Sequence, residues 1–299
     1  MDFWGEFSKL IAELIDELAV HSIIPPGVPI TPTSPLIALT NYLIWLGVAF
    51  LTTAIFFAIA SRKISLVPKG VANLAEFGVE FVRDSIVTDT LGAAGVKYFP
   101  FVGTLFFFIL FCNLWGLFGV PVPWPVGTTG GLHLLPIQEW RILMAKPATG
   151  DISITATWAL IVFFYFWYEG IRKNGVIKYL GSFAPGGAPP GIKQMVWVLE
   201  FVLMFMRPVT LAVRLFANMY AGHLVLGVFS IFALLGGQMM IELVKGNMAS
   251  GLGGGLIFIL SLLLLVALYA FELFVALIQA YVFSMLTVQY INLSIHTDH

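Results

Sequence analysis

The chain has 299 residues, of which 59% are hydrophobic and only 10% are charged. Soluble domains contain roughly 45–50% apolar and about 25% charged residues, so the composition excludes a soluble globular fold and predicts an all-α polytopic membrane protein. The 15 basic and 16 acidic residues nearly balance, which argues against a nucleic-acid partner. The single cysteine, Cys112, excludes an internal disulfide. No Gly-Lys-Ser/Thr phosphate loop is present, so we expect a non-catalytic chain with no nucleotide site, cofactor or metal.

Residues 1–35 form a segment of their own. In its first half, apolar side chains recur at helical spacing, namely Phe3, Phe7, Leu10, Leu14 and Leu18. The acidic residues Glu6, Glu13, Asp16 and Glu17 lie between them. This pattern predicts an amphipathic surface helix, and the lack of a basic n-region argues against a signal peptide. Prolines between positions 25 and 35 then predict a stiff, extended lead-in to the membrane.

Five apolar stretches are interpreted as membrane-crossing helices, each of which needs about 20 residues. The first is 36–60. The second and third, Tyr98–Val122 and Ile152–Tyr168, form a hairpin within 98–170 around a loop at about residues 123–150. The last two lie within 195–299, and their length predicts a long helical hairpin.

Lysine and arginine set the expected orientation, because cytoplasmic loops are enriched in both. They follow the first crossing as Arg62, Lys63 and Lys69, and the third crossing as Arg172, Lys173, Lys178 and Lys193. We therefore expect 61–97 to be cytoplasmic and to include an amphipathic helix from Val71 to Val87, and 171–194 to be a cytoplasmic basic loop. The N-terminus is then outside, the 123–150 loop is external, and the C-terminus is cytoplasmic.

The fourth crossing carries three charges at intervals of seven residues, Glu200, Arg207 and Arg214, and Asn218 continues the same helical stripe. Charges within a bilayer are costly and usually functional. Glu200 and Arg207 allow two interpretations, an ion pair that fixes the helices or part of an ion path. Arg214 lies deep in the apolar run with no acid three or four residues away, which favours a functional role.

The fifth crossing carries one carboxylate, Glu272, with Gln279 on the same face. A hairpin folded at the polar, glycine-rich stretch 238–255 pairs residues whose numbers sum to about 493. This register sets Gln279 opposite Arg214 and Glu272 opposite His223. The hairpin 195–299 is therefore expected to carry the ion path, with ionisable side chains on both sides of a fixed cation.

Three motifs carry a resemblance to a known family. Arg207–Gly222, with the sequence RPVTLAVRLFANMYAG, closely resembles the signature of subunit a of F-type ATP synthases. Phe271–Phe283 resembles the last helix of that family, and Asp151–Thr155 resembles the entry to its third crossing. The likeness is densest around Arg214 and weak in the N-terminal third.

The resemblance implies a proton-translocating stator subunit that offers two half-channels to a rotating c-ring. By position it makes Arg214 the essential cation facing the ring carboxylates, with Asn218 and Gln279 as its polar neighbours. The other matches, from the external to the cytoplasmic side, are Asp151 in the external vestibule, His223 and Glu272 in the external half-channel, and Glu200 toward the cytoplasmic one.

The family also implies partners and a location. These are the c-ring proteolipid, the peripheral-stalk subunit b, the rest of the ATP synthase complex and membrane lipid, in a bacterial plasma membrane. It further implies that the last two helices are strongly tilted. A secondary transporter of ions or solutes is the alternative, although we find no internal repeat of the kind such folds show. A purely structural membrane scaffold would need neither Arg214 nor Glu272.

Overall fold

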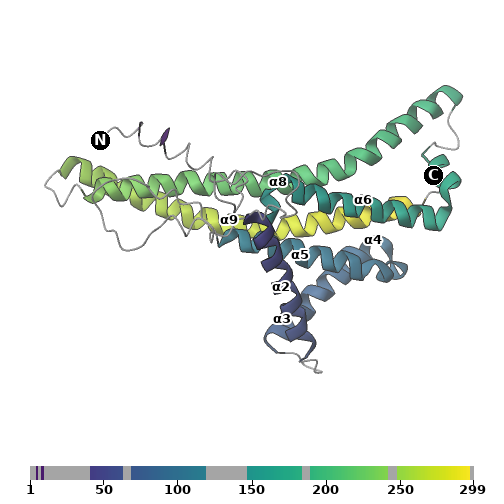
Figure 1. The fold of residues 1–299 in the computed structure, drawn as a ribbon, viewed down its shortest axis with the longest axis horizontal. Helices are drawn as coiled ribbons and strands as arrows, with labels where there is room; N and C mark the ends of the chain where they lie inside the picture. The colour runs from purple at the N-terminus through teal and green to yellow at the C-terminus, as the bar shows by residue number, and fades with distance from the viewer. Residues whose placement is uncertain are drawn as a thin grey trace, which may run out of the picture. The chain divides into compact units, whose positions relative to one another are not determined.

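The structure is a computed structural model that describes residues 5, 8–9, 41–62, 69–118, 147–183, 189–241 and 248–296. Every regular element in these ranges is helical (Figure 1). Most of the expected N-terminal helix, the proline-rich lead-in, most of the expected external loop and residues 242–247 lie outside the described residues.

Four described helices are long and apolar enough to cross a membrane. Three of them are α6 (Ile152–Asn174), α8 (Pro190–Ile241) and α9 (Met248–Ile295), and the fourth is α5 (Phe99–Leu117) together with the 3₁₀ turn η2 (Ala93–Tyr98) that leads into it. The all-α polytopic fold is thus confirmed. The first expected crossing falls on α2 (Asn41–Ser61), whose apolar stretch is shorter, so that crossing stays a prediction.

The helix ends differ from the expected boundaries at the basic segment 171–194. α6 continues to Asn174, so Arg172 and Lys173 occupy its last turn, where cations complement the helix dipole. Gly175, with φ 77°, ends α6 and turns the chain into the short helix α7 (Val176–Gly181). Part of the expected loop is therefore helical.

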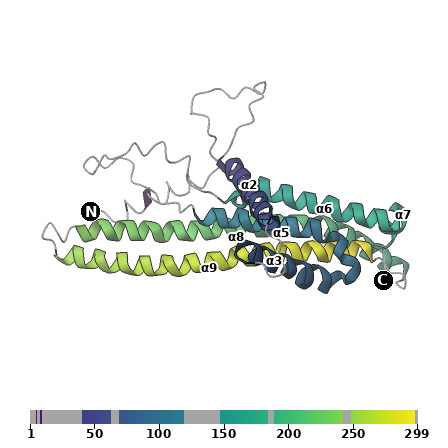
Figure 2. The same cartoon turned by 90° about the horizontal axis from the view of Figure 1, so that it is seen from below.

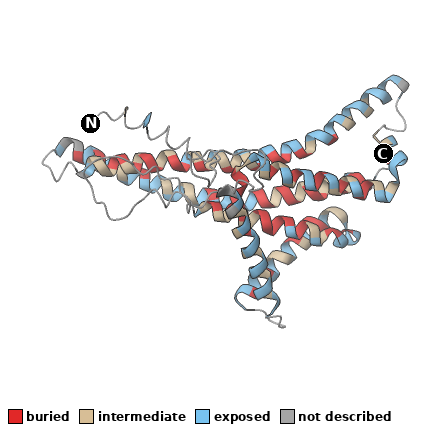
Figure 3. Ribbon diagram, viewed as in Figure 1, coloured by how far each residue is buried: buried red, intermediate tan, exposed pale blue. Residues whose placement is uncertain are grey.

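The chain consists of two compact units, and each helix of the long hairpin contributes to both. Unit 1 holds residues 1–48, 112–150 and 218–276; unit 2 holds 49–111, 151–217 and 277–299. α8 has 52 residues and α9 has 48, more than twice the number needed to span a bilayer. Buried and exposed residues alternate along most of α8, whereas the first half of α9 is mostly exposed or half-buried and buried residues become frequent only in its second half (Figure 3).

In unit 1, α8 and α9 lie side by side (Figure 1 and Figure 2). A Cβ added to Gly236 would lie 2.6 Å from the backbone nitrogen of Phe258, and one added to Gly254 would lie 2.7 Å from the backbone nitrogen of Met240. These contacts require glycine, because only a missing side chain lets the backbones approach so closely. They pair residues in the register expected from the sequence.

In unit 2 the core is formed by α5, α6 and the adjoining parts of α8 and α9. Aromatic rings join these helices: Phe101 stacks on Tyr165 with ring centroids 3.8 Å apart, and Phe163 contacts Phe205 at 5.5 Å. Aliphatic side chains such as Leu211 of α8 and Ile109 of α5 fill the spaces between. This packing leaves one face of α8 outside the core.

The expected amphipathic helix is α3 (Val71–Glu80), which continues as a π-helical stretch, η1 (Phe81–Thr88), followed by the short helix α4 (Asp89–Leu91). α3 packs through small residues: Ala72 and Ala75 are buried, and a Cβ on Gly78 would lie 2.8 Å from the Phe107 ring. η1 adds larger side chains to the unit 2 core, because Val82, Ile86 and Val87 are fully buried. Leu74 and Phe77 stay 62% and 69% exposed. This apolar exposure is what a helix lying on a bilayer surface requires.

Candidate functional site

The carboxylate of Glu272 in α9 lies in the space that the missing side chain of Gly222 leaves on α8. Glu272 and His223 are only 4% and 2% exposed, although both are ionisable. A Cβ on Gly222, the neighbour of His223 in α8, would overlap both carboxylate oxygens of Glu272. Glu272 Oε1 meets no hydrogen-bond donor among the described residues. The two helices therefore hold a buried carboxyl group against Gly222, the residue next to His223, in the hairpin register expected from the sequence. A pairing of Glu272 with His223 stays a prediction.

Two further polar residues, Asn113 of α5 and Thr149, bound this site in unit 1. Asn113 is fully buried; its Nδ2 donates to the carbonyl of Ala276 at 3.3 Å, and its Oδ1 accepts from Thr149 Oγ1 at 2.8 Å. Ala276 lies one turn beyond Glu272 in α9. Thr149 belongs to a 3₁₀ turn, η4 (Ala148–Gly150), that precedes α6. We call Asn113, Thr149, His223 and Glu272 the polar cluster.

A second glycine brings His223 close to α5. A Cβ on Gly116 would lie 2.9 Å from the Cα of Pro147 and 3.3 Å from His223 Nε2. Gly116 is therefore the position at which the 147–150 segment and the imidazole both approach α5. Sequence reasoning missed Asn113 and Thr149. The available signal was an uncharged polar side chain, Asn113, in the middle of an otherwise apolar crossing.

In unit 2, two of the three charges on α8 form an ion pair. Arg207 Nη2 donates to Glu200 Oε1 at 2.5 Å, and the guanidinium lies over the ring of Tyr290, 5.6 Å from its centroid. Of the two interpretations of Glu200 and Arg207, the ion pair is present; a role for Glu200 in an ion path stays a prediction. Nearby Tyr179 of α7 is buried, and burial raises its pKa to about 12, so the phenol stays neutral beside the pair.

Arg214 differs from Arg207 in its surroundings. It is exposed, while Leu211, Ala212 and Leu215 next to it are buried in the unit 2 core. No carboxylate of the described residues lies within ion-pair distance of it. An unpaired arginine at the centre of a crossing costs about 2.5–3.5 kcal/mol on insertion scales, so Arg214 needs a partner supplied from outside this part of the chain.

The remaining expected residues lie in three different settings. Gln279 is buried, 8% exposed, and no described hydrogen bond joins it to Arg214, so their pairing stays a prediction. Asn218 is half-buried on α8. Asp151 caps α6, because its Oδ1 accepts from the backbone N–H of Ser153 at 2.8 Å. In the described part of the chain, no group of three or more His, Cys, Asp or Glu could hold a metal ion.

Comparison with known proteins identifies the family of the chain. The family model described as ATP synthase A chain matches residues 42–292, which include every spanning helix described above apart from a few terminal residues. The chain belongs to the ATP synthase subunit a family.

Curated subunit a proteins from three bacteria illustrate the extent of the similarity. The chain is 38% identical to ATP synthase subunit a of Nitrobacter hamburgensis over 263 residues, which is 88% of this chain and 91% of the relative. It is 37% identical to that of Bradyrhizobium diazoefficiens, over 84% and 90% of the two chains. For Magnetococcus marinus the identity is 34% over 92% of each. The similarity to the subunit a family thus extends over nearly the whole length of both partners.

Proposed function

We propose that Arg214 is the fixed cation that separates two half-channels and faces the carboxylates of a rotating c-ring. The observation that carries the proposal is the contrast between the two arginines of α8. Arg207 is neutralised by Glu200, whereas Arg214 is exposed beside a buried core and lacks a described carboxylate partner. As a member of the subunit a family, the chain is a membrane-embedded, proton-translocating stator subunit of ATP synthase.

The chemistry of guanidinium suits a separator. Arginine keeps its proton at any working pH, so it cannot relay protons between the half-channels. It can attract a deprotonated ring carboxylate, and it releases that carboxylate once a proton neutralises it. Asn218 and Gln279 act in this proposal as its polar neighbours.

The external half-channel is assigned to the polar cluster. Carboxyl and imidazole groups can each accept and release a proton. The Glu272 carboxylate lies against Gly222, the residue that precedes His223 in α8. Asn113 fixes the α9 backbone one turn away from Glu272 through Ala276, so the carboxyl group keeps its place as protons pass. Asp151 is assigned to the external vestibule, and its capping bond keeps the start of α6 in place.

Glu200 is assigned to the cytoplasmic half-channel, where Arg207 orients its carboxylate. In the complete assembly the c-ring proteolipid covers the exposed face of α8 around Arg214, and the peripheral-stalk subunit b holds the stator. The proposed site is a bacterial plasma membrane, with the N-terminus outside and the C-terminus cytoplasmic. A secondary transporter is not favoured, because the family match extends over 42–292.

Replacement of Arg214 tests the proposal. Arg214→Ala and Arg214→Lys should both abolish proton-driven ATP synthesis in membrane vesicles while the complex still assembles, because an ammonium does not reproduce the planar guanidinium fork. Arg207→Lys is the matched control, since it keeps a cation beside Glu200 and should retain much of the rate. ATP synthesis near the parent rate in either Arg214 variant would refute the role.

A further inference from the structure

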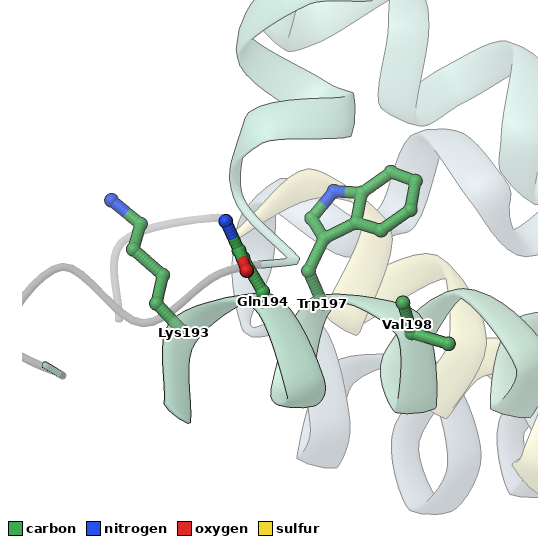
Figure 4. A pocket seen from close by; sticks show the side chains of 4 residues that line it. All are labelled: Lys193, Gln194, Trp197 and Val198. Atoms are coloured by element: carbon green, nitrogen blue, oxygen red, sulfur yellow. The ribbon is translucent and has the colours of Figure 1, made fainter. Parts of the chain in front are cut away.

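The first turns of α8 line a pocket that the proton path does not use. It has a volume of about 340 Å³ and is bordered by Lys193, Gln194, Trp197 and Val198, all in unit 2. These side chains rise from one side of the helix (Figure 4). Their spacing places them on one stripe, so a single ligand can touch them all.

The surface inside the pocket is apolar, so Lys193 and Gln194 border it with carbon atoms and keep their polar ends outside it. The Lys193 ammonium and the Gln194 amide can donate hydrogen bonds to a phosphate. Trp197 is held in place, because its Nε1 donates to the carbonyl of Leu180 in α7 at 2.8 Å. Its ring and Val198 then offer an apolar wall. Tryptophan prefers the membrane interface, where one part of a ligand is polar and the next is hydrocarbon.

The stretch of sequence that leads to the pocket is basic, and the nearest acidic residues, Glu169 and Glu200, are paired with Arg172 and Arg207. Between Ile171 and Leu199 the chain contains no acidic residue and four basic ones, namely Arg172, Lys173, Lys178 and Lys193. Lys193 is exposed and forms no ion pair with any described residue. An anion bound here therefore meets a cation that nothing described neutralises.

The apolar side of the pocket continues along the membrane span. Val198, Leu199 and Val202 are 55%, 51% and 51% exposed, so an apolar strip runs from the pocket along α8. A free anion would gain nothing from this strip. A molecule with an anionic head and a hydrocarbon tail would contact both parts.

We propose that this pocket binds an anionic phospholipid, with its phosphate against Lys193 and Gln194 and an acyl chain against Trp197 and Val198. The lipid site does not depend on the proton path. The experiment below therefore tests it independently of the role proposed for Arg214.

Photolabelling of the assembled complex tests the site. The complex is reconstituted into vesicles that contain phosphatidylglycerol and phosphatidylcholine, with a photoreactive group at the same acyl position in one lipid or the other. After irradiation, labelled peptides are quantified by mass spectrometry. The exposed apolar face of α2 at Phe50, Leu51 and Ile55 serves as the internal reference for unspecific lipid contact.

The ratio of phosphatidylglycerol to phosphatidylcholine label at 193–198 should exceed the ratio at α2 by about five-fold, as expected for one well-placed lysine. Lys193→Gln should bring it down to the α2 ratio. Lys193→Arg should keep the preference, and Lys69→Gln, which removes an exposed lysine before α3, should leave it unchanged.

Three results would overturn the proposal. The first is an equal ratio at the pocket and at α2. The second is a preference that survives Lys193→Gln, which would assign it to the general basic surface. The third is labelling of α2 without labelling of 193–198 by either lipid, which would mean that protein covers the pocket.

Discussion

The carboxylate of Glu272 lies against the backbone of Gly222, so closely that any side chain at position 222 would overlap it. Gly222 is thus the residue of α8 that admits an ionisable group into the hairpin. His223 follows Gly222 directly, so one turn of α8 provides both the space for the Glu272 carboxylate and a second side chain that can bind a proton. This contact makes the position of the proposed external half-channel testable residue by residue.

Gly222→Ala should displace the Glu272 carboxylate without changing any ionisable group. We expect proton flux through the complex to fall about ten-fold or more, which corresponds to ~1.4 kcal/mol or more in the barrier. The measurement is proton uptake into vesicles after an imposed potential. Gly253→Ala is the control, because a Cβ there meets nothing within 4 Å. Equal proton flux in the Gly222→Ala and Gly253→Ala variants would show that the contact between Glu272 and Gly222 is irrelevant to the proton pathway.

Asn113→Ala should destabilise the hairpin junction more than Thr149→Val. The first change removes two bonds and leaves the buried Thr149 hydroxyl without its acceptor, whereas the second removes one bond only. An unsatisfied buried polar group costs about 1–3 kcal/mol, so thermal unfolding of the assembled complex should shift down in that order. Thr104→Val is the control, because its exposed hydroxyl bonds only to the Pro100 carbonyl of the same helix. The reverse order would contradict the assigned bonds.

The exchange of His223 and Glu272 tests whether the two side chains share one pathway. Glu272→Gln and His223→Ala should each slow proton entry, because each removes a group that can carry a proton. His223→Glu combined with Glu272→His retains both groups in one pocket and should restore more flux than either exchange alone. A double variant no faster than the slower single exchange would separate the two residues functionally.

Cysteine labelling tests the proposed orientation. In a Cys112→Ala background, Lys173→Cys at the exposed end of α6 should react with a membrane-impermeant reagent only from the cytoplasmic side. Gly130→Cys should react only from outside. The expectation comes from the clusters of lysine and arginine that follow the first and third crossings. Reversed labelling would exchange the two half-channel assignments.

The amino-acid sequence by itself determined the long hairpin of this protein. The expected hairpin 195–299 corresponds to α8 (Pro190–Ile241) and α9 (Met248–Ile295), although α8 begins five residues earlier than expected. Hydropathy and helical spacing are local properties, so they fix where a helix runs and which charges it carries. The hairpin register also followed from the sequence, because the glycine-rich stretch between the helices marks the fold point and Gly236 and Gly254 then meet the opposite backbone.

Only the tertiary structure decided which side chains these helices bring together. The bond from Asn113 to Ala276 joins residues 163 positions apart, and no local pattern encodes such a contact. The sequence set Arg214 apart, because no acid lies three or four residues from it, but it left open whether Arg207 pairs with Glu200. Packing decided this: Arg207 bends back to Glu200 over the ring of Tyr290, while Arg214 is left exposed beside the buried core. Contacts between distant segments depend on how helices pack, and that packing is a property of the folded chain.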